Sequence, residues 1–427
     1  MKKDSKIGIV GYGVEGRSTH DYLKKQGFLN ITILDENETL ECDEKCILGE
    51  KIWECLNDFD VLFRSPGIHP RRVLKTFQGK LSSHMEFFFE KCPVPIISIT
   101  GTKGKGTTSS LTQKMIEESG KKCFLGGNIG MPPLDFLDEI QANDYVVLEV
   151  SSFQAMTFKQ SPHIAVILMV TSEHLDYHKD TQEYIDAKAQ MLKNQREDDY
   201  CIYHKDFESS KYIASLSQAR KLGFSSQSFP LAPQQVGATC DAFHDCQIAL
   251  PGKHNLNNIA AAVEVVKILN ISDEYIKEVL KTFTGLPMHI EKISEKNGIS
   301  YINDSFSTTP ETTLAALDSF PEKNIVVMIG GSSKGSDYSE LLDYIILCDT
   351  VFPVFYGEEG KVLSEKITQK KSVDYVKDFK QAFLKAQSIL EEKNGGVLLL
   401  SPACASFDQF KNYKERGEKF NTFIYAS

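Results

Sequence analysis

Residues 98–108 combine glycines, hydroxyl groups and lysines as a phosphate-binding loop requires. Glycines let backbone N–H groups turn towards phosphate oxygens, and a helix N-terminus after the loop adds positive potential. Lys105 would neutralise phosphate charge. Because Gly106 stands where a hydroxyl is usual, Thr107 is the expected Mg²⁺ ligand. The alternative is a glycine-rich surface turn. The candidate nucleotide-binding residues are Gly101, Thr102, Lys103, Gly104, Lys105, Gly106, Thr107 and Thr108.

Three further side chains that could do chemistry follow the loop. Glu149 lies near the end of an apolar run at 145–150, and His174 follows a second apolar run at 163–170. Open parallel sheets bind ligands at the carboxyl ends of their strands, and a carboxylate there is a hard oxygen ligand suited to Mg²⁺. Lys188 lies in a helical stretch. The ordinary alternatives are a structural histidine and a solvated lysine.

The first segment of the chain carries a second glycine pattern, Gly11-x-Gly13-x-x-Gly16, after another apolar run. With Asp35 further along, this is the fingerprint of a dinucleotide-binding fold, where glycines allow a tight turn and a close approach to a pyrophosphate. Alone, the pattern would favour an NAD-dependent oxidoreductase. It is weak without other motifs, so the class of nucleotide depends on the rest of the chain.

Strand-like apolar runs alternate with helical ones, which predicts an α/β fold. The runs at 145–150 and 163–170 lack polar alternation, as expected for parallel strands covered on both faces. A helix is expected over 107–119, directly after the phosphate loop. We expect three domains, which comprise residues 1–92, 93–285 and 286–427.

Composition narrows the class of partner. The chain has 427 residues and a formal net charge of −10, which disfavours binding to nucleic acid. We expect no signal peptide, and the longest apolar run, 164–170, is too short to span a membrane. The ten cysteines contain no C-x-x-C pair, and we interpret them as reduced thiols of a cytoplasmic protein.

Several blocks of the sequence resemble the Mur ligase family, whose relatives include the folylpolyglutamate synthetases. The longest block, 401–410 followed by Arg416-Gly417, is typical of the branch that adds D-glutamate. The Gly-Lys-Gly-Thr sequence at 104–107 is closer to the folate branch. The other matching blocks are residues 148–154, 171–178, 184–188, 250–261, 303–309 and 330–337.

The resemblance implies a Rossmann-like N-terminal domain, a P-loop ATPase-like central domain with a parallel sheet, and a Rossmann-like C-terminal domain. It implies a monomeric, ATP-dependent ligase of peptidoglycan precursor synthesis, which adds D-glutamate to UDP-N-acetylmuramoyl-L-alanine through an acyl phosphate. Two alternatives stay open: a folylpolyglutamate-synthetase-like ligase, and a degenerate relative that only binds nucleotide. The second is motivated by departures from the family motifs at Gly106, Met169, Met288, His289 and Phe306.

The family's functional residues carry over to matching positions of this chain. Lys105, Glu149, His174 and Lys188 would be catalytic. A bare ammonium beside Mg²⁺ would be repelled, so Lys188 would be carbamylated, as in the family. The metal ligands would be Thr107, Glu149, His174 and carbamylated Lys188. Outside the phosphate loop, ATP would contact Asn255, Asn258, His289 and Asp304. The nucleotide sugar would contact Gly13, Val14, Glu15, Asp35, Glu36, Gly67, Asn128, Ser152 and Gln154. D-Glutamate would contact Thr308, Lys334, Ser406, Phe407 and Tyr413.

Overall fold

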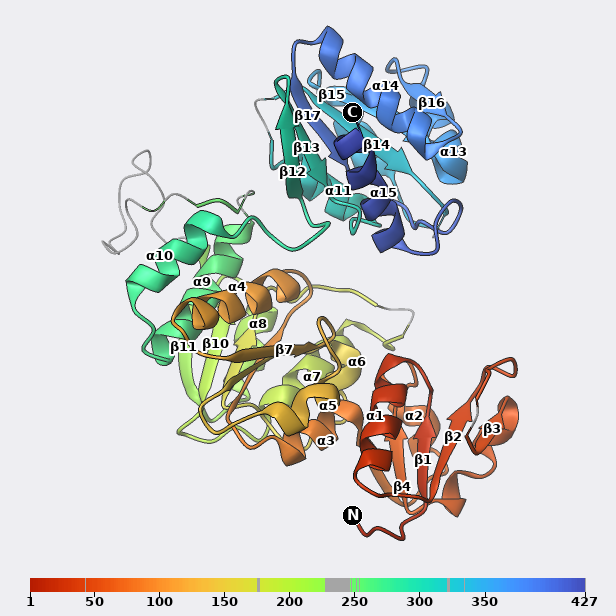
Figure 1. Cartoon of the computed structure of the whole chain (residues 1–427), viewed down its shortest axis with the longest axis vertical. Helices are drawn as coiled ribbons and strands as arrows, with labels where there is room; N and C mark the ends of the chain where they lie inside the picture. Colours follow the sequence, from red (N-terminus) through yellow and green to blue (C-terminus); the bar gives the residue numbers. More distant parts are fainter. Residues whose placement is uncertain are drawn as a thin grey trace. The chain divides into compact units, whose positions relative to one another are not determined.

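The polypeptide forms three sheets flanked by helices, which confirms the predicted α/β fold class (Figure 1). Contacts group the chain into two compact units. Unit 1 comprises Met1–Gln247 and His254–Leu280, and unit 2 comprises Ile248–Lys253 and Lys281–Ser427. The computed structural model describes residues 1–42, 44–174, 177–226, 246, 248–250, 252, 254–320, 323–333 and 335–426.

The first sheet of unit 1 has the strand order β3-β2-β1-β4-β5, with all neighbours parallel. Its strands are β1 (Ile7–Val10), β2 (Ile31–Asp35), β3 (Cys46–Leu48), β4 (Val61–Arg64) and β5 (Lys80–Ser83). Its helices are α1 (Val14–Lys25), α2 (Pro70–Leu74) and α3 (His84–Lys91). Phe88 of α3 packs on Phe136, with ring centroids 5.6 Å apart, so this sheet shares a core with the next one.

The second sheet of unit 1 has the order β11-β10-β9-β6-β8-β7, again with all neighbours parallel. Its strands are β6 (Ile96–Thr100), β7 (Cys123–Gly127), β8 (Tyr145–Glu149), β9 (Ile164–Ile167), β10 (Tyr200–His204) and β11 (Arg220–Phe224). Its helices are α4 (Lys105–Glu118), α5 (Pro133–Phe136), α6 (Ser152–Ala155), α7 (Thr181–Ala189), α8 (Glu208–Ser215), α9 (Asn255–Ile268) and α10 (Asp273–Thr282).

Unit 2 contains the third sheet, of order β12-β13-β17-β14-β15-β16, in which only β12 is antiparallel among the described strands. Alternate residues of β14 enter two different cores, so helices cover both faces of this sheet. The strands are β12 (Glu291–Lys296), β13 (Ile299–Asn303), β14 (Ile325–Gly330), β15 (Val351–Tyr356), β16 (Asp374–Val376) and β17 (Gly396–Leu400). The helices are α11 (Pro310–Leu317), α12 (Ser339–Leu347), α13 (Gly357–Ile367), α14 (Phe379–Glu392) and α15 (Tyr413–Ala426).

Two boundaries differ from the sequence prediction near the phosphate loop. Helix α4 begins at Lys105 instead of 107, because Gly104 caps it in a left-handed conformation. Strand β9 ends at Ile167 instead of 170. The chain after it turns to the loop, where the carbonyl oxygen of Met169 accepts a hydrogen bond from the N–H of Thr102 at 2.7 Å. Of the helices in the described part of the chain, none is long and apolar enough to cross a membrane.

Candidate active site

The phosphate loop closes on the first turn of α4. Gly104 has a φ of 86°, in the region that favours glycine, and a Cβ there would collide with Oδ1 of Asn258. Lys105 Nζ donates hydrogen bonds to the carbonyl oxygens of Gly101 and Thr102, at 3.0 and 2.9 Å. Burial lowers the pKa of Lys105, while nearby carboxylates oppose that change. The lysine therefore folds back over the loop.

Helix α9 supports the loop from one side. Thr108 Oγ1 donates to Oδ1 of Asn258 at 3.4 Å, and Asn258 Nδ2 donates to Oδ1 of Asn255 at 2.8 Å. All three side chains are buried. The two predicted ATP contacts of α9 thus also hold the phosphate loop in place, a structural role that the sequence analysis missed.

Glu149 ends β8 at the carboxyl edge of the same sheet. It is 3% exposed, and its Oε1 accepts a hydrogen bond from Nδ2 of Asn128 at 2.7 Å. Burial raises the pKa of Glu149, while the charge of Lys105, the hydrogen bond from Asn128 and the charge of Lys188 oppose the rise. The carboxylate therefore shares its surroundings with both lysines.

Lys188 extends from α7 into this region and is 1% exposed. Its Nζ donates to the carbonyl oxygen of Gly101 at 2.9 Å and lies 4.5 Å from the ring centre of Tyr184. Burial, followed by the charge of Lys105, lowers the pKa of Lys188 well below its usual value. This environment favours the uncharged amine, which is the form that reacts with carbon dioxide.

His174, in the segment after β9, is largely open to solvent, with 46% of its side chain exposed. Its ring packs against Phe153, with centroids 4.9 Å apart, and its Nε2 lies 3.8 Å from Oε2 of Glu173. Within the described residues, no three His, Cys, Asp or Glu side chains are grouped to bind a metal on their own. Mg²⁺ would need further oxygen ligands, which the hydroxyl of Thr107 and a carbamate on Lys188 would supply.

A pocket of about 360 Å³ lies at the carboxyl ends of β1, β2 and β4. The carboxylate of Asp35 shapes its floor by accepting hydrogen bonds from the N–H groups of Tyr12 and Asn37, at 2.7 and 2.9 Å. Glu36 instead pairs with Arg72 at 2.6 Å and does not line this pocket. The lining residues are Gly11, Tyr12, Gly13, Val14, Glu15, Asp35, Ser65, Pro66, Gly67 and Ile68.

Helix α6, which follows β8 of the second sheet, is joined to this pocket through Gln154. Gln154 Nε2 donates to Oε1 of Glu15 at 2.5 Å, and Ser152 Oγ lies 3.0 Å from Nε2 of His178. Burial raises the pKa of Glu15 to about 7, against the effects of the hydrogen bond from Gln154 and the charge of Arg64. The predicted contacts Glu15, Ser152 and Gln154 therefore lie in one connected region of unit 1.

In unit 2, the Arg416-Gly417 pair fastens α15 to the loops after β13 and β17. The buried Arg416 donates to Oγ and the carbonyl oxygen of Ser305, at 3.0 and 2.9 Å, and to the carbonyl oxygen of Cys404 at 3.1 Å. A Cβ on Gly417 would meet Sδ of Met288 at 2.6 Å. The Arg416-Gly417 pair therefore has a packing role in unit 2.

Asp304 follows β13 and is 2% exposed. Its Oδ1 accepts from the N–H of Ile290 at 3.1 Å, and its Oδ2 accepts from Oγ of Ser401 at 2.7 Å. Burial raises the pKa of Asp304 to about 7, although these hydrogen bonds lower it. The predicted nucleoside contact is thus buried, with both carboxylate oxygens bonded inside the unit.

Phe306 and His289, which stand where the family has Lys and Arg, form a ring stack with centroids 4.0 Å apart. Tyr413 packs edge-on to Phe306 at 5.2 Å, and Phe306 is 45% exposed. Of the other predicted D-glutamate contacts, Thr308 is half-buried, Ser406 is buried and Phe407 is 71% exposed. Lys334 lies outside the described residues.

Comparison with known proteins identifies the family of the chain. Residues 99–266 match the Mur ligase middle domain, and residues 290–404 match the Mur ligase glutamate ligase domain. The chain belongs to the Mur ligase family. A Mur ligase from Acetivibrio thermocellus, named UDP-N-acetylmuramoylalanine–D-glutamate ligase, is 34% identical to it, and the match covers 99% of this chain and 96% of the relative.

Solved structures share the Mur ligase fold at low sequence identity. MurF from Acinetobacter baumannii has a TM-score of 0.63 and 14% identity, over 98% of this chain and 90% of that one. A folylpolyglutamate synthase from Mycobacterium tuberculosis has a TM-score of 0.59 and 12% identity, over 79% and 94%. Because both branches share the fold, these likenesses do not discriminate between their substrates.

The structure of this Mur ligase brings Lys105, Glu149 and Lys188 together at the phosphate loop, while their roles stay predictions. Three structural roles were not predicted from the sequence: Arg64 and Tyr177 hold the turn after β4 in unit 1, and Arg416 holds the loops after β13 and β17 in unit 2. Tyr177 and Arg416 stood inside matching motif blocks. Arg64 could have been singled out because it is a charged residue at the end of an apolar strand.

Proposed function

We propose that this chain is the ATP-dependent ligase that adds D-glutamate to UDP-N-acetylmuramoyl-L-alanine. That reaction supplies peptidoglycan precursors, and so serves cell wall biogenesis, cell shape and cell division. The observation that carries the proposal is the match over 99% of the chain, at 34% identity, to a relative named for this activity. The convergence of Lys105, Glu149 and Lys188 at the phosphate loop supports it.

The proposed reaction passes through an acyl phosphate. The γ-phosphoryl group of ATP is transferred to the carboxylate of the L-alanyl residue, which gives ADP and the activated acyl group. The amine of D-glutamate then attacks the carbonyl carbon, phosphate leaves and the amine loses a proton. Lys105, at the start of α4, would stabilise charge on the transferred group together with the backbone N–H groups of the loop.

Mg²⁺ would be held by Thr107, Glu149, His174 and carbamylated Lys188, and when bound it would offset charge between the carboxylate and the γ-phosphate. The side chains fit such an ion. Glu149 supplies a carboxylate, and the buried Lys188 is in surroundings that favour the amine needed for carbamate formation. The carbamate turns a group that would repel the ion into an oxygen ligand.

Each predicted domain has a proposed ligand. The nucleotide sugar is assigned to residues 1–92, ATP to 93–285 and D-glutamate to 286–427. We place the enzyme in the cytoplasm, where ATP and nucleotide sugars are available, and we expect a monomer because one chain contributes every proposed site residue. Gel filtration of the purified protein tests the monomer.

Phosphate release tests the activity directly. With ATP and Mg²⁺, release should require both UDP-N-acetylmuramoyl-L-alanine and D-glutamate. Release with a folate and L-glutamate instead would assign the chain to the folate branch. Absence of release with either pair would favour a degenerate relative. A panel of D- and L-amino acids tests the acceptor, because Phe306 and His289 remove two cationic side chains of the family pattern.

A further inference from the structure

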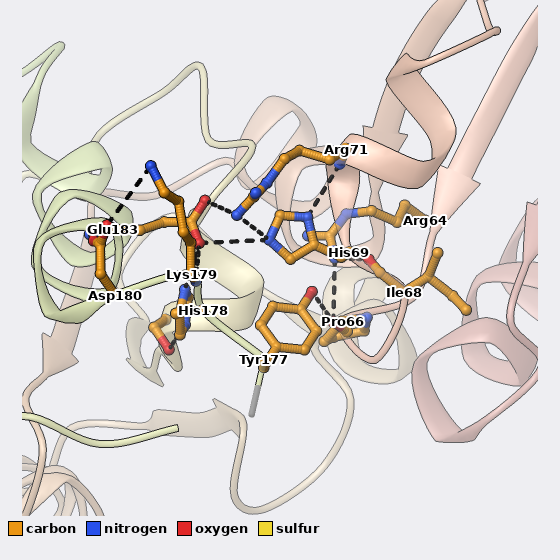
Figure 2. A network of polar contacts seen from close by, with 11 residues as sticks. Arg64, Pro66, Ile68, His69, Arg71, Tyr177, His178, Lys179, Asp180 and Glu183 are labelled. Carbon is orange, nitrogen blue, oxygen red and sulfur yellow. Dashed lines mark hydrogen bonds and ion pairs between the residues drawn. The ribbon is translucent and has the colours of Figure 1, made fainter. Parts of the chain in front are cut away.

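The turn after β4 forms one wall of the nucleotide-sugar pocket and is held from behind by a buried arginine. Arg64 is 1% exposed, and its Nη1 donates to the carbonyl oxygens of Ser65, Pro66 and Ile68, at 3.2, 3.2 and 2.7 Å. Figure 2 shows Arg64 beside Pro66 and Ile68. Ser65, Pro66 and Ile68 also line the pocket. One guanidinium therefore fixes the backbone of the wall.

Two residues that follow strands β8 and β9 also contact Arg64 and the turn. Arg64 Nη2 donates to the carbonyl oxygen of Phe153 at 2.8 Å, and the hydroxyl of Tyr177 donates to the carbonyl oxygen of Pro66 at 2.8 Å. The ring of Tyr177 packs against two others, with centroids 4.1 Å from Phe153 and 4.9 Å from His69. These contacts restrict the ring whose hydroxyl donates to Pro66.

Helix α7 anchors the segment that follows the turn. Glu183 Oε1 accepts from Arg71, and its Oε2 lies 3.8 Å from Nε2 of His69 (Figure 2). Oε2 also accepts from the N–H of Lys179 at 2.6 Å, which orients the carboxylate. Lys188 lies on the same helix. The helix proposed to carry the carbamate is therefore fastened to the segment that follows the pocket wall.

We propose that Tyr177 is a positioning residue for the nucleotide-sugar substrate, because its hydroxyl holds the carbonyl group of Pro66 and thereby the wall of the pocket. The inference rests on the proposed function, which assigns the nucleotide sugar to residues 1–92, and all residues that line this pocket belong to that range. Tyr177 does not line the pocket, so it acts through Pro66. The pocket wall contacts a part of the substrate that does not react, so it contributes equally to binding of the substrate and of the transition state. Loss of the Tyr177 hydroxyl should therefore raise KM and leave kcat unchanged.

Tyr177→Phe removes the hydroxyl and keeps the stacked ring. We expect the KM for UDP-N-acetylmuramoyl-L-alanine to rise about fivefold, in keeping with the loss of one hydrogen bond. The kcat and the KM for ATP should stay within about twofold of the wild type. Tyr22→Phe is the matched control, because Tyr22 of α1 also donates its hydroxyl across unit 1, to Oδ1 of Asp138 at 3.4 Å, but lies away from the pocket. It should leave all three constants unchanged.

An unchanged nucleotide-sugar KM in Tyr177→Phe would overturn the proposal, and so would an equal rise in Tyr22→Phe, which would indicate general loosening of unit 1. Glu183→Gln gives an independent variant if Tyr177→Phe does not fold. It weakens the anchor of Arg71 and should also raise that KM.

Calorimetric titration with UDP alone separates this inference from the proposed function. A wild-type chain that binds UDP but does not turn over would overturn the proposed activity. The UDP affinity of Tyr177→Phe would then decide the inference, which requires a weaker affinity than that of the wild type. Equal UDP affinities of the wild type and Tyr177→Phe would contradict the inference.

Discussion

Lys188 and Lys105 both donate a hydrogen bond to the carbonyl oxygen of Gly101, at 2.9 and 3.0 Å. Two ammonium groups that share one buried acceptor repel each other, and the charge of Lys105 is the second cause, after burial, of the lowered pKa of Lys188. The carbonyl oxygen of Gly101 thus holds one lysine of the phosphate loop that is suited to a phosphate, and a second lysine, from α7, whose surroundings disfavour its charge.

Removal of the second lysine should abolish turnover. Lys188→Ala is expected to lower kcat more than about 100-fold, because a missing metal ligand withdraws several kcal/mol of charge stabilisation. Acetate or formate should restore part of the activity by replacing the carbamate. Lys179→Ala, at an exposed lysine just before the same helix, should have no effect. A carbamate signal in ¹³C NMR with labelled bicarbonate checks the modification, and its absence from the active wild type would contradict the assignment.

Glu149→Gln should separate activity from stability. The amide oxygen can still accept from Asn128, but the anionic metal ligand is lost, so we expect kcat to fall more than about 100-fold. Burial raises the pKa of Glu149, so the folded state disfavours the carboxylate at neutral pH, and the neutral amide should leave Tm equal or higher. Thermal unfolding at pH 7.5 measures this. A clear drop in Tm would show that the carboxylate stabilises the fold.

The strands and the phosphate loop could be predicted from the sequence, because apolar runs and glycine spacing are patterns of neighbouring residues. The hydrogen bond from Tyr177 to Pro66 joins residues 111 positions apart, and no local pattern reports such a partner. Asp304 shows a second limit. Its motif predicted a nucleoside contact, but burial and two hydrogen bonds inside the unit depend on how the loop after β13 packs.

Glu15 should make unit 1 less stable as the pH rises. Its folded pKa, about 7, lies above its ordinary value of 4.5, so between these values the native state holds a proton that the unfolded chain has lost. Unfolding free energy therefore falls with increasing pH across that window. Glu15→Gln removes this titration, so its Tm relative to the wild type should rise from pH 4.5 to pH 8.

The difference in Tm between the wild type and Glu15→Gln reports the titration of Glu15 alone. Asp304 also has a pKa of about 7, but it adds the same pH dependence to both proteins. Glu118→Gln, at an exposed position of α4, is the matched control for the change of glutamate to glutamine and should leave Tm close to that of the wild type. Parallel Tm curves for the wild type and Glu15→Gln would show that the carboxyl group of Glu15 does not titrate in this window.

Arg416→Ala should destabilise unit 2 and weaken the binding of D-glutamate. The variant leaves the carbonyl oxygens of Ser305 and Cys404 without these donors, and each buried unsatisfied group costs about 1–3 kcal/mol. We expect the unfolding free energy to fall by about 3 kcal/mol, with a smaller loss in Arg416→Lys. The KM for D-glutamate should rise, because Thr308 and Ser406 lie on the loops that Arg416 fastens.

Two spectroscopic probes can locate that destabilisation. Trp53 is the single tryptophan of the chain and lies in unit 1, whereas circular dichroism reports all helices. Arg416→Ala should therefore shift the urea midpoint seen by circular dichroism more than the midpoint seen by Trp53 fluorescence. Lys414→Ala, at an exposed position on α15, should shift neither. An unchanged circular dichroism midpoint in Arg416→Ala would mean that the three hydrogen bonds of this arginine contribute little to the stability of unit 2.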